Sequence, residues 1–360
     1  MATIAIVGAG MMGTALAWPL CDNGHTVRLV GTPLDGAIVE SLREARTHPR
    51  LSRRIPDGVQ VFSHAEIPEA IEGVDLIASG VSSFGVAWFA DTVGPHLCHE
   101  IPVIAVTKGL EDNPNGDLAI LPDVTEARLP AHLQGRVRLC AIGGPCIAHE
   151  LAARRQTCVV FSGREVETLE ALKTIFATDY YHIWLSTDLI GVEVCAALKN
   201  GYAMGVGLAV GMMEAAGPDG LANMYNPQAG LFAQGCREMR LLLQVLGGSV
   251  ENVAWLPGAG DLYVTVFGGR TVRLGKLLGS GLSFAEARER LAGETLESVE
   301  IISRVARALP KLEKRGLVRM EDFPLLLHLD AILNRGETVR IPWETFFNGV
   351  NGSNGLSGAA

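Results

Sequence analysis

A glycine-rich turn near the start of the chain limits the folds that this sequence can adopt. Gly8–Gly13 (Gly-Ala-Gly-Met-Met-Gly) follows an apolar run at residues 3–7 and opens a helical pattern at residues 12–23. In such a strand–turn–helix unit the first glycine allows a tight turn, the second lets the backbone approach a pyrophosphate, and the third lets the helix pack on the strand. The helix N-terminus favours the negative charge of a phosphate. The spacing therefore predicts a Rossmann-like unit that binds a dinucleotide.

The rest of the chain divides into two patterns. Up to about residue 185, short β-branched runs alternate with helix-length segments, and this alternation predicts a parallel, doubly wound α/β sheet. The predicted strands after the first are residues 26–30, 74–78, 102–107, 137–142, 158–161 and 182–184. Residues 188–310 show long helical patterns, at 188–215 and 226–246, and no convincing strand. We therefore expect a Rossmann-like N-terminal domain (1–185), an all-helical C-terminal domain (186–345) and a flexible Gly/Ser/Asn-rich tail (346–360).

Composition excludes several classes of protein. The net charge of −9 argues against a nucleic-acid partner, although a small anionic substrate could still meet a local cluster of Lys and Arg. The seven cysteines are odd in number and irregularly spaced, which favours reduced thiols in a cytoplasmic protein over disulfides or a metal site. The most membrane-like run, residues 200–213, is shorter than the ~20 residues of a span and predicts a buried helix.

Glycine is unusually frequent, with 42 of 360 residues against a typical usage of roughly 7%. Several glycines lie in the predicted helix after Lys199, namely Gly201, Gly205, Gly207 and Gly211. Glycine weakens a helix, so its repeated use there predicts close packing against a neighbouring helix.

The choice between NAD and NADP stays open at this point. NAD enzymes usually carry an acidic residue at the end of the second strand, but here that strand runs into Gly31-Thr-Pro without one, and Asp35 lies just beyond. Arg28, Arg43 and Arg46 could meet the 2′-phosphate of NADP, although solvated helix faces are the favoured interpretation for these three.

Four charged residues in apolar or glycine-rich surroundings are candidates for chemistry. Lys108 follows a predicted strand, at the edge where α/β folds bind ligands, and Lys199 interrupts the least charged helix. Either lysine could protonate a carbonyl oxygen, or could be a surface lysine whose stem covers apolar side chains. Asp261 follows a glycine-rich turn and could cap a helix or pair with a lysine. Arg270, after two glycines, could hold a phosphate or be an ordinary loop arginine.

Six segments in order resemble the NAD(P)-dependent sn-glycerol-3-phosphate dehydrogenase family. Besides the glycine turn, these are Thr107–Glu111, Gly144–Ala152, Asp188–Asn200, the set Asn226, Ala229, Leu231, Gly235, Glu238 and Met239, and Gly260–Arg270 with its Gly-Asp-Leu, Thr265 and Gly-Gly-Arg. The resemblance covers residues 3 to about 340. It implies reversible hydride transfer between NAD(P)H and dihydroxyacetone phosphate in a homodimer.

The resemblance also implies a role for individual residues. Lys199 would be the general acid/base, with Lys108 and Asp261 orienting the substrate carbonyl and completing a polar relay. Asn200 and Arg270 would hold the substrate phosphate, and Thr265 and Thr271 would line its pocket. The residues implied in coenzyme binding are Gly8, Gly10, Met11, Met12, Gly13, Lys108, Ala148, Arg270 and Glu297.

Three departures from the family pattern keep alternatives open. Thr271 stands where the family usually has Asn, residues 211–225 form a longer segment than usual, and Cys146 replaces a Ser or Thr. A phosphorylated polyol larger than glycerol phosphate is therefore an alternative substrate. A β-hydroxyacid-type dehydrogenase and a non-catalytic dinucleotide sensor are further alternatives, and the presence of both Lys199 and Asp261 argues against the sensor.

Overall fold

The computed structural model describes residues 1–98, 100–113, 115–217 and 225–347, which form two compact units. The first unit comprises Met1–Glu111, Ala119–Ala196 and Trp255–Asp261, and the second comprises Asp112–Leu118, Ala197–Ala254 and the chain from Leu262 onward. The sequence-based boundary near residue 186 falls at the end of the last sheet strand, about ten residues before the packing changes from one unit to the other. Most of the expected tail, residues 348–360, lies outside the described residues.

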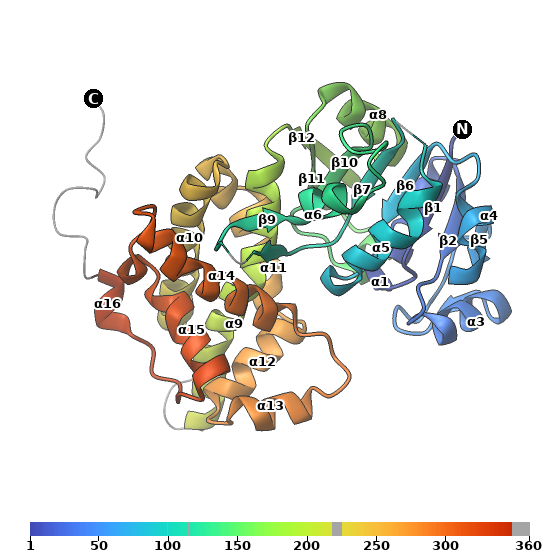
Figure 1. The fold of residues 1–360 in the computed structure, drawn as a ribbon. Coiled ribbons are helices and arrows are strands. Elements are labelled where there is room, and N and C mark those ends of the chain that lie inside the picture. Colours follow the sequence, from blue (N-terminus) through green and yellow to red (C-terminus); the bar gives the residue numbers. More distant parts are fainter. Residues whose placement is uncertain (99, 114, 218–224, 348–360) are drawn as a thin grey trace. The chain divides into compact units, whose positions relative to one another are not determined.

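An eight-stranded sheet in the order β12-β11-β10-β7-β6-β1-β2-β5 forms the centre of the first unit (Figure 1). Its strands are β1 (Thr3–Val7), β2 (Thr26–Val30), β5 (Val59–Phe62), β6 (Leu76–Ser79), β7 (Pro102–Ala105), β10 (Arg138–Gly143), β11 (Thr157–Gly163) and β12 (Tyr181–Ser186). The predicted doubly wound sheet is confirmed, but the expectation that all its strands run parallel is wrong for one pair. β10 and β11 are antiparallel, and the connection between them contains the five-residue helix α7 (Ala148–Ala152).

Helices cover both faces of this sheet. They are α1 (Met11–Ala15), α2 (Ala17–Asp22), α3 (Gly36–Glu44), α4 (Ile67–Ile71), α5 (Val86–Val93), α6 (Leu121–Arg128), α7 (Ala148–Ala152) and α8 (Val166–Phe176). Side chains of β1 alternate between two apolar clusters: Ile4 and Ile6 pack with α2 and α8, whereas Ala5 and Val7 pack with α5 and α6. This burial on both faces explains why the strands are almost continuously apolar.

The second unit is built from helices. These are α9 (Leu189–Ala216), α10 (Tyr225–Leu246), α11 (Asp261–Val266), α12 (Arg270–Gly279), α13 (Phe284–Arg290), α14 (Glu297–Lys314), α15 (Pro324–Arg335) and α16 (Trp343–Phe347). The longest of them are α9, α10 and α14. The two long helices that the sequence predicts are confirmed. α9 begins in the first unit and continues into the second, and α11 begins at the last residue of the first.

Two short hairpins were not predicted. β3 (Thr47–His48) pairs with β4 (Arg53–Arg54) in the first unit, and β8 (Leu110–Asp112) pairs with β9 (Leu118–Ile120). Two ion pairs join the second hairpin to α14, Asp112 with Arg307 at 2.7 Å and Asp117 with Arg315 at 2.6 Å. Strands of two or three residues carry too little periodicity to be recognised in a sequence.

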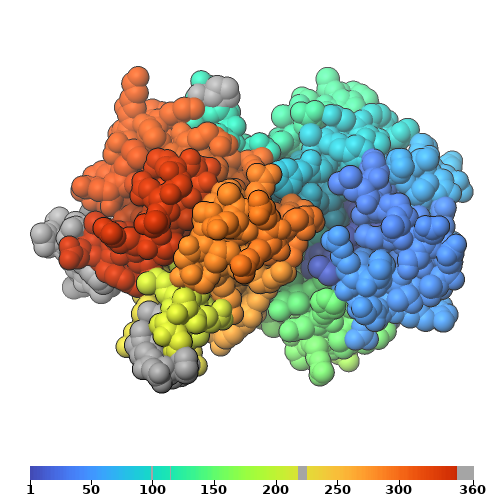
Figure 2. All heavy atoms as spheres, turned by 90° about the horizontal axis from the view of Figure 1, so that it is seen from below, coloured from blue at the N-terminus to red at the C-terminus, as the bar shows by residue number. Residues whose placement is uncertain are grey.

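Glycines of α9 allow very close packing against α12. A Cβ atom on Gly207 would lie 2.8 Å from the carbonyl oxygen of Val272, and one on Gly211 would collide with the backbone of Lys276. In Figure 2 the end of α9 (yellow) lies beside α12 (orange). Glu214 of α9 and Lys276 of α12 form an ion pair at 2.9 Å. The predicted reason for glycine in this helix is confirmed.

Glu238, one of the residues on which the family resemblance rests, has a structural role in the second unit. Its buried carboxylate accepts hydrogen bonds from the backbone amides of Leu325 (2.8 Å) and Leu326 (3.0 Å) and from the side chain of Gln234 (2.7 Å). It therefore satisfies amides at the start of α15 that have no partner within their own helix. Burial raises the pKa of this carboxyl to about 7.

Candidate functional site

The glycine turn of the first unit is a tightly packed crossing of three backbones. Gly8 has a φ of +115°, and a Cβ atom there would lie 2.6 Å from the carbonyl carbon of Gly80, the residue after β6. A Cβ on Gly80 would in turn lie 2.8 Å from the Cα of Gly13. Sequence reasoning missed Gly80, whose only sign was its position two residues after the predicted strand at 74–78.

Gly10 differs from its neighbours because protein packing does not require it to be glycine. Apart from its chain neighbours, the nearest atom of the described residues to a Cβ built there is the carbonyl oxygen of Gly80 at 4.0 Å. Gly10 is the residue before α1, and Met11 and Met12 follow as the first residues of that helix. An open glycine at a helix N-terminus is what the approach of a pyrophosphate requires. The residues present therefore fit a dinucleotide.

Ala9, between the first two glycines, is held from two sides. Its amide donates to Asp35 Oδ2 at 3.2 Å, and its carbonyl oxygen lies 3.0 Å from Nε2 of the buried His48. Nδ1 of His48 accepts from the amides of Arg50 and Leu51, so the ring is neutral with its proton on Nε2. Burial lowers the pKa of His48, which keeps the ring in this form. Contacts of Asp35 and His48 with Ala9 therefore hold the glycine turn, and no local pattern in the sequence predicts them.

The three arginines considered for a 2′-phosphate bind backbone oxygens instead. Arg28 donates to the carbonyl of Glu72 at 2.8 Å, Arg43 to that of Val61 at 3.2 Å, and Arg46 to that of Val59 at 2.7 Å. These guanidinium groups tie helices and loops to the sheet, so the alternative that they receive a phosphate is not supported.

Lys108 and Asp261 form an ion pair within the first unit. Lys108 follows β7, and its Nζ lies 2.5 Å from Asp261 Oδ2 and 3.3 Å from the carbonyl oxygen of Gly144. The side chain of Asp261 is 2% exposed and that of Lys108 is 18% exposed. Of the two interpretations that the sequence allowed for Asp261, the geometry favours the lysine partner over the helix cap.

Lys199 and Thr265 form a second polar contact, within the second unit. Lys199 lies in α9 and its Nζ donates to Thr265 Oγ1 at 2.8 Å. Both Lys199 and its neighbour Asn200 are 8% exposed. Thr265 lies in α11, one helical turn after Asp261. The amine of Lys199 is therefore oriented by a hydroxyl group rather than lying on the surface.

Arg270 and Thr271 begin α12, where the preceding Gly269 adopts a φ of +90°. Arg270 is exposed, and no carboxylate pairs with it in the part of the chain that the structure describes. A guanidinium group beside helix-terminal amides can bind an oxyanion. The two remaining sequence candidates also begin helices: Ala148 is the buried first residue of α7, and the half-buried Glu297 is the first residue of α14.

Glu193 was not singled out from the sequence. It lies in α9 within the first unit, is 1% exposed, and neither carboxylate oxygen has a hydrogen-bond partner among the described residues. Burial raises the pKa of this carboxyl to about 8, against the opposing effect of the positive charge of Lys108. Glu193 is therefore a neutral acid at neutral pH.

We predict that Glu193→Gln changes how stability depends on pH. With an ordinary pKa near 4.5 when unfolded and about 8 when folded, Glu193 contributes stability below pH 4.5 that is lost as the pH rises toward 8. The slope is at most about 1.4 kcal/mol per pH unit. Urea unfolding at pH 5.5 and 8 should show the variant gaining stability relative to wild type at the higher pH. The exposed Glu170→Gln serves as control, and an equal difference at both pH values would contradict the prediction.

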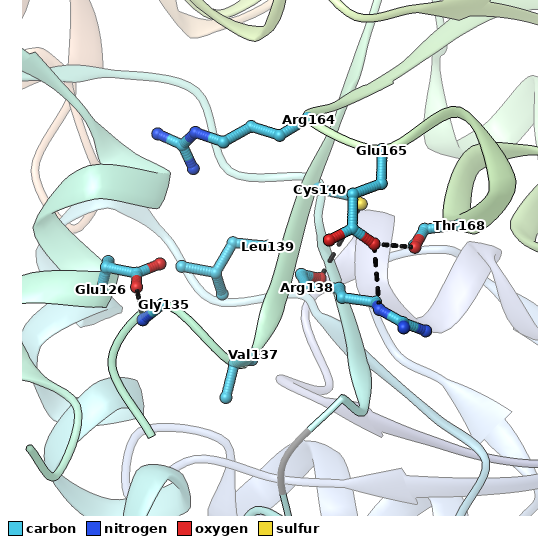
Figure 3. A pocket seen from close by; sticks show the side chains of 9 residues that line it. All are labelled: Glu126, Gly135, Val137, Arg138, Leu139, Cys140, Arg164, Glu165 and Thr168. Carbon is cyan, nitrogen blue, oxygen red and sulfur yellow. Dashed lines mark hydrogen bonds and ion pairs between the residues drawn. The ribbon is translucent and has the colours of Figure 1, made fainter. Parts of the chain in front are cut away.

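A cavity of about 310 Å³ in the first unit lies away from these residues. Arg138, Leu139 and Cys140 at the start of β10 line it, together with Arg164, Glu165 and Thr168 at the start of α8 (Figure 3). Glu165 pairs there with Arg138 at 3.0 Å and accepts from Thr168 at 3.0 Å. Ligands of open α/β sheets bind at the carboxyl ends of the parallel strands, and this cavity lies at the opposite end of β10. We therefore do not assign the candidate site to it.

Comparison with known proteins decides the family. The model of the NAD-dependent glycerol-3-phosphate dehydrogenase N-terminus matches residues 3–169, and that of the C-terminus matches residues 188–344. The chain belongs to the NAD-dependent glycerol-3-phosphate dehydrogenase family. It is an oxidoreductase that uses NAD or NADP, and the resemblance noted in the sequence is confirmed.

Relatives of this dehydrogenase agree with the assignment. The NADP(+)-dependent glycerol-3-phosphate dehydrogenase of Archaeoglobus fulgidus is 37% identical over 297 residues, which cover 82% of this chain and 86% of the relative. Glycerol-3-phosphate dehydrogenase [NAD(P)+] of Streptococcus pneumoniae is 30% identical, covering 82% and 83%. The crystal structure of glycerol-3-phosphate dehydrogenase from Coxiella burnetii superposes with a TM-score of 0.79 at 26% identity, covering 98% of this chain and 99% of that one. Within the described residues, no helix is long and apolar enough to cross a bilayer.

Proposed function

We propose that this dehydrogenase interconverts dihydroxyacetone phosphate and sn-glycerol 3-phosphate, with Lys199 as the general acid/base. The observation that carries the proposal is the buried side chain of Lys199, whose amine is held by Thr265 Oγ1 at 2.8 Å in a largely apolar helix. The nicotinamide coenzyme, when bound, supplies or accepts the hydride. The chain must then supply or accept the proton at the substrate oxygen, and a positioned lysine can do so.

Lys108 and Asp261 are proposed to orient the carbonyl and to complete the proton relay. The buried carboxylate of Asp261 fixes the position of the Lys108 ammonium group, so that its charge is directed before substrate binds. A charge that is already in place costs no reorganisation during the reaction. The glycine turn and Ala148 of the first unit, with Lys108, Arg270 and Glu297, are proposed to bind the coenzyme.

The substrate phosphate is proposed to bind at the start of α12. Arg270 would supply a charged fork, Thr271 a hydroxyl group and Asn200 an amide, and the helix N-terminus favours the negative charge. The experiment that tests the function is an activity panel with NADH and NADPH against small keto and polyol phosphates. Turnover with a larger ketose phosphate only would favour the alternative substrate. No turnover with any of them, alongside normal coenzyme binding, would refute the proposal.

We predict that Arg270→Ala mainly raises the KM for dihydroxyacetone phosphate. A charge-assisted hydrogen bond contributes about 1.5–3 kcal/mol, which corresponds to an increase in KM of roughly 10- to 100-fold. Steady-state kinetics at saturating coenzyme measures this. The matched control is Arg319→Ala, an exposed arginine paired with Asp322 in the same unit. An unchanged KM for Arg270→Ala would show that another residue anchors the phosphate.

Two further properties are proposed, the location of the protein in the cell and its oligomeric state. The irregular spacing of seven free cysteines favours a reducing compartment, and we propose a cytoplasmic location. The family resemblance favours a homodimer, which sedimentation of the purified protein would test.

A further inference from the structure

We propose that Arg50 and Arg53 of the β3–β4 hairpin bind the 2′-phosphate of the coenzyme, so that this chain prefers NADP(H) to NAD(H). The inference rests on the proposed dinucleotide-binding function and goes beyond it, because the family includes users of either coenzyme. The two arginines that would distinguish NADP(H) from NAD(H) lie in a hairpin that the sequence pattern does not predict.

The hairpin is attached to the glycine turn. His48, the last residue of β3, contacts the carbonyl oxygen of Ala9, the residue between Gly8 and Gly10. Arg53 is the ladder partner of His48, and the amide of Arg50 donates to the His48 ring at 3.2 Å. Both arginines therefore belong to the short hairpin whose buried histidine is fixed on the turn. In this fold class the adenosine ribose lies near the same turn and the end of β2.

The charges of these two arginines are available to a ligand. Both side chains are exposed, and no carboxylate pairs with either within the described parts of the chain. Arg54, their neighbour, differs because it pairs with Asp57 at 3.0 Å. An arginine fork matches the geometry of phosphate oxygens, and the 2′-phosphate is the charged group that distinguishes NADP from NAD.

The acidic residue that would favour NAD is already engaged. Oδ2 of Asp35 accepts hydrogen bonds from the Ala9 amide at 3.2 Å and from both the amide and the hydroxyl group of Thr32 at 2.8 Å. Oδ2 of this carboxylate is thus occupied by donors of the protein itself, from the glycine turn and from Thr32. If its other oxygen held a ribose hydroxyl, NAD(H) would be preferred instead, and this is the competing outcome of the test.

The test compares two fragments that differ only in the 2′-phosphate, namely 2′,5′-ADP and 5′-AMP. Isothermal titration calorimetry on the full chain measures the dissociation constant of each, without reference to catalysis. The variants are Arg50→Ala/Arg53→Ala, with Arg54→Ala as the matched control from the same hairpin. We expect wild type and the control to bind 2′,5′-ADP at least about 10-fold more tightly than 5′-AMP. The double variant should bind the two within about twofold.

Each other result overturns the inference in a distinct way. Equal binding of both fragments by wild type would mean that no group recognises the 2′-phosphate. A preference that persists in the double variant would assign recognition to other residues. If 5′-AMP, NADH and NADPH all failed to bind, the proposed dinucleotide function would fail together with this inference. Binding of 5′-AMP without any gain from the 2′-phosphate would overturn only the inference.

Discussion

Replacing Lys199 with alanine is expected to lower kcat by about 10²- to 10⁴-fold, the range that a positioned general acid contributes. The affinity for coenzyme should change by no more than about twofold, because Lys199 is not among the residues proposed to bind the coenzyme. Its Nζ contacts Thr265 Oγ1, so removal of the amine deletes the proton donor and this hydrogen bond. Stopped-flow or steady-state assays of carbonyl reduction measure kcat, and fluorescence titration measures coenzyme binding.

Two controls separate a lost proton donor from a damaged fold. Lys314→Ala removes an exposed lysine of the same unit and should leave kcat unchanged. A primary amine added to the Lys199→Ala variant should restore part of the rate, with a pH dependence that follows the pKa of the added amine. Wild-type kcat in Lys199→Ala would remove the general-acid assignment. A loss of rate that no amine restores, together with a lower free energy of unfolding, would indicate a structural role.

Some features of the fold and of the site are determined by neighbouring residues in the sequence, and these features could be predicted. The glycine turn follows directly from three glycines between a strand and a helix. The long α9 helix is apolar over many turns, so a lysine within it at residue 199 is conspicuous. Lys108 follows a strand of strong β-branched character. In each case neighbours in the sequence are sufficient to fix the local structure.

Other parts depend on contacts between distant residues. Lys108 and Asp261 are 153 residues apart, so only the fold shows that Asp261 is a lysine partner and not a helix cap. His48 reaches Ala9 across 39 residues through a hairpin too short to detect. The antiparallel direction of β11 relative to β10 follows from no local pattern in the sequence. Packing between residues far apart in the sequence determines these features, and local sequence patterns do not predict such packing.

Replacing Asp261 with alanine is expected to reduce both stability and activity. Because Asp261 is 2% exposed and pairs with Lys108 at 2.5 Å, its removal leaves a largely buried ammonium group without its carboxylate. Breaking such a pair costs about 3 kcal/mol, toward the lower end of the range for fully buried pairs because Lys108 is 18% exposed. Urea unfolding measures the loss of stability, and kcat should fall because the position of Lys108 is no longer fixed.

The double variant Lys108→Met/Asp261→Leu separates the two effects. Both replacements are apolar and remove the two charges together, and replacement of a buried ion pair by apolar side chains is often neutral or stabilising. The double variant should therefore recover most of the free energy of unfolding that Asp261→Ala loses, while its kcat stays as low as that of the single variant. If stability and kcat recover together, the pair serves the fold alone. If Asp261→Ala retains wild-type stability and kcat, the ion pair has neither role, because a buried charge left without its partner should register in at least one of the two measurements.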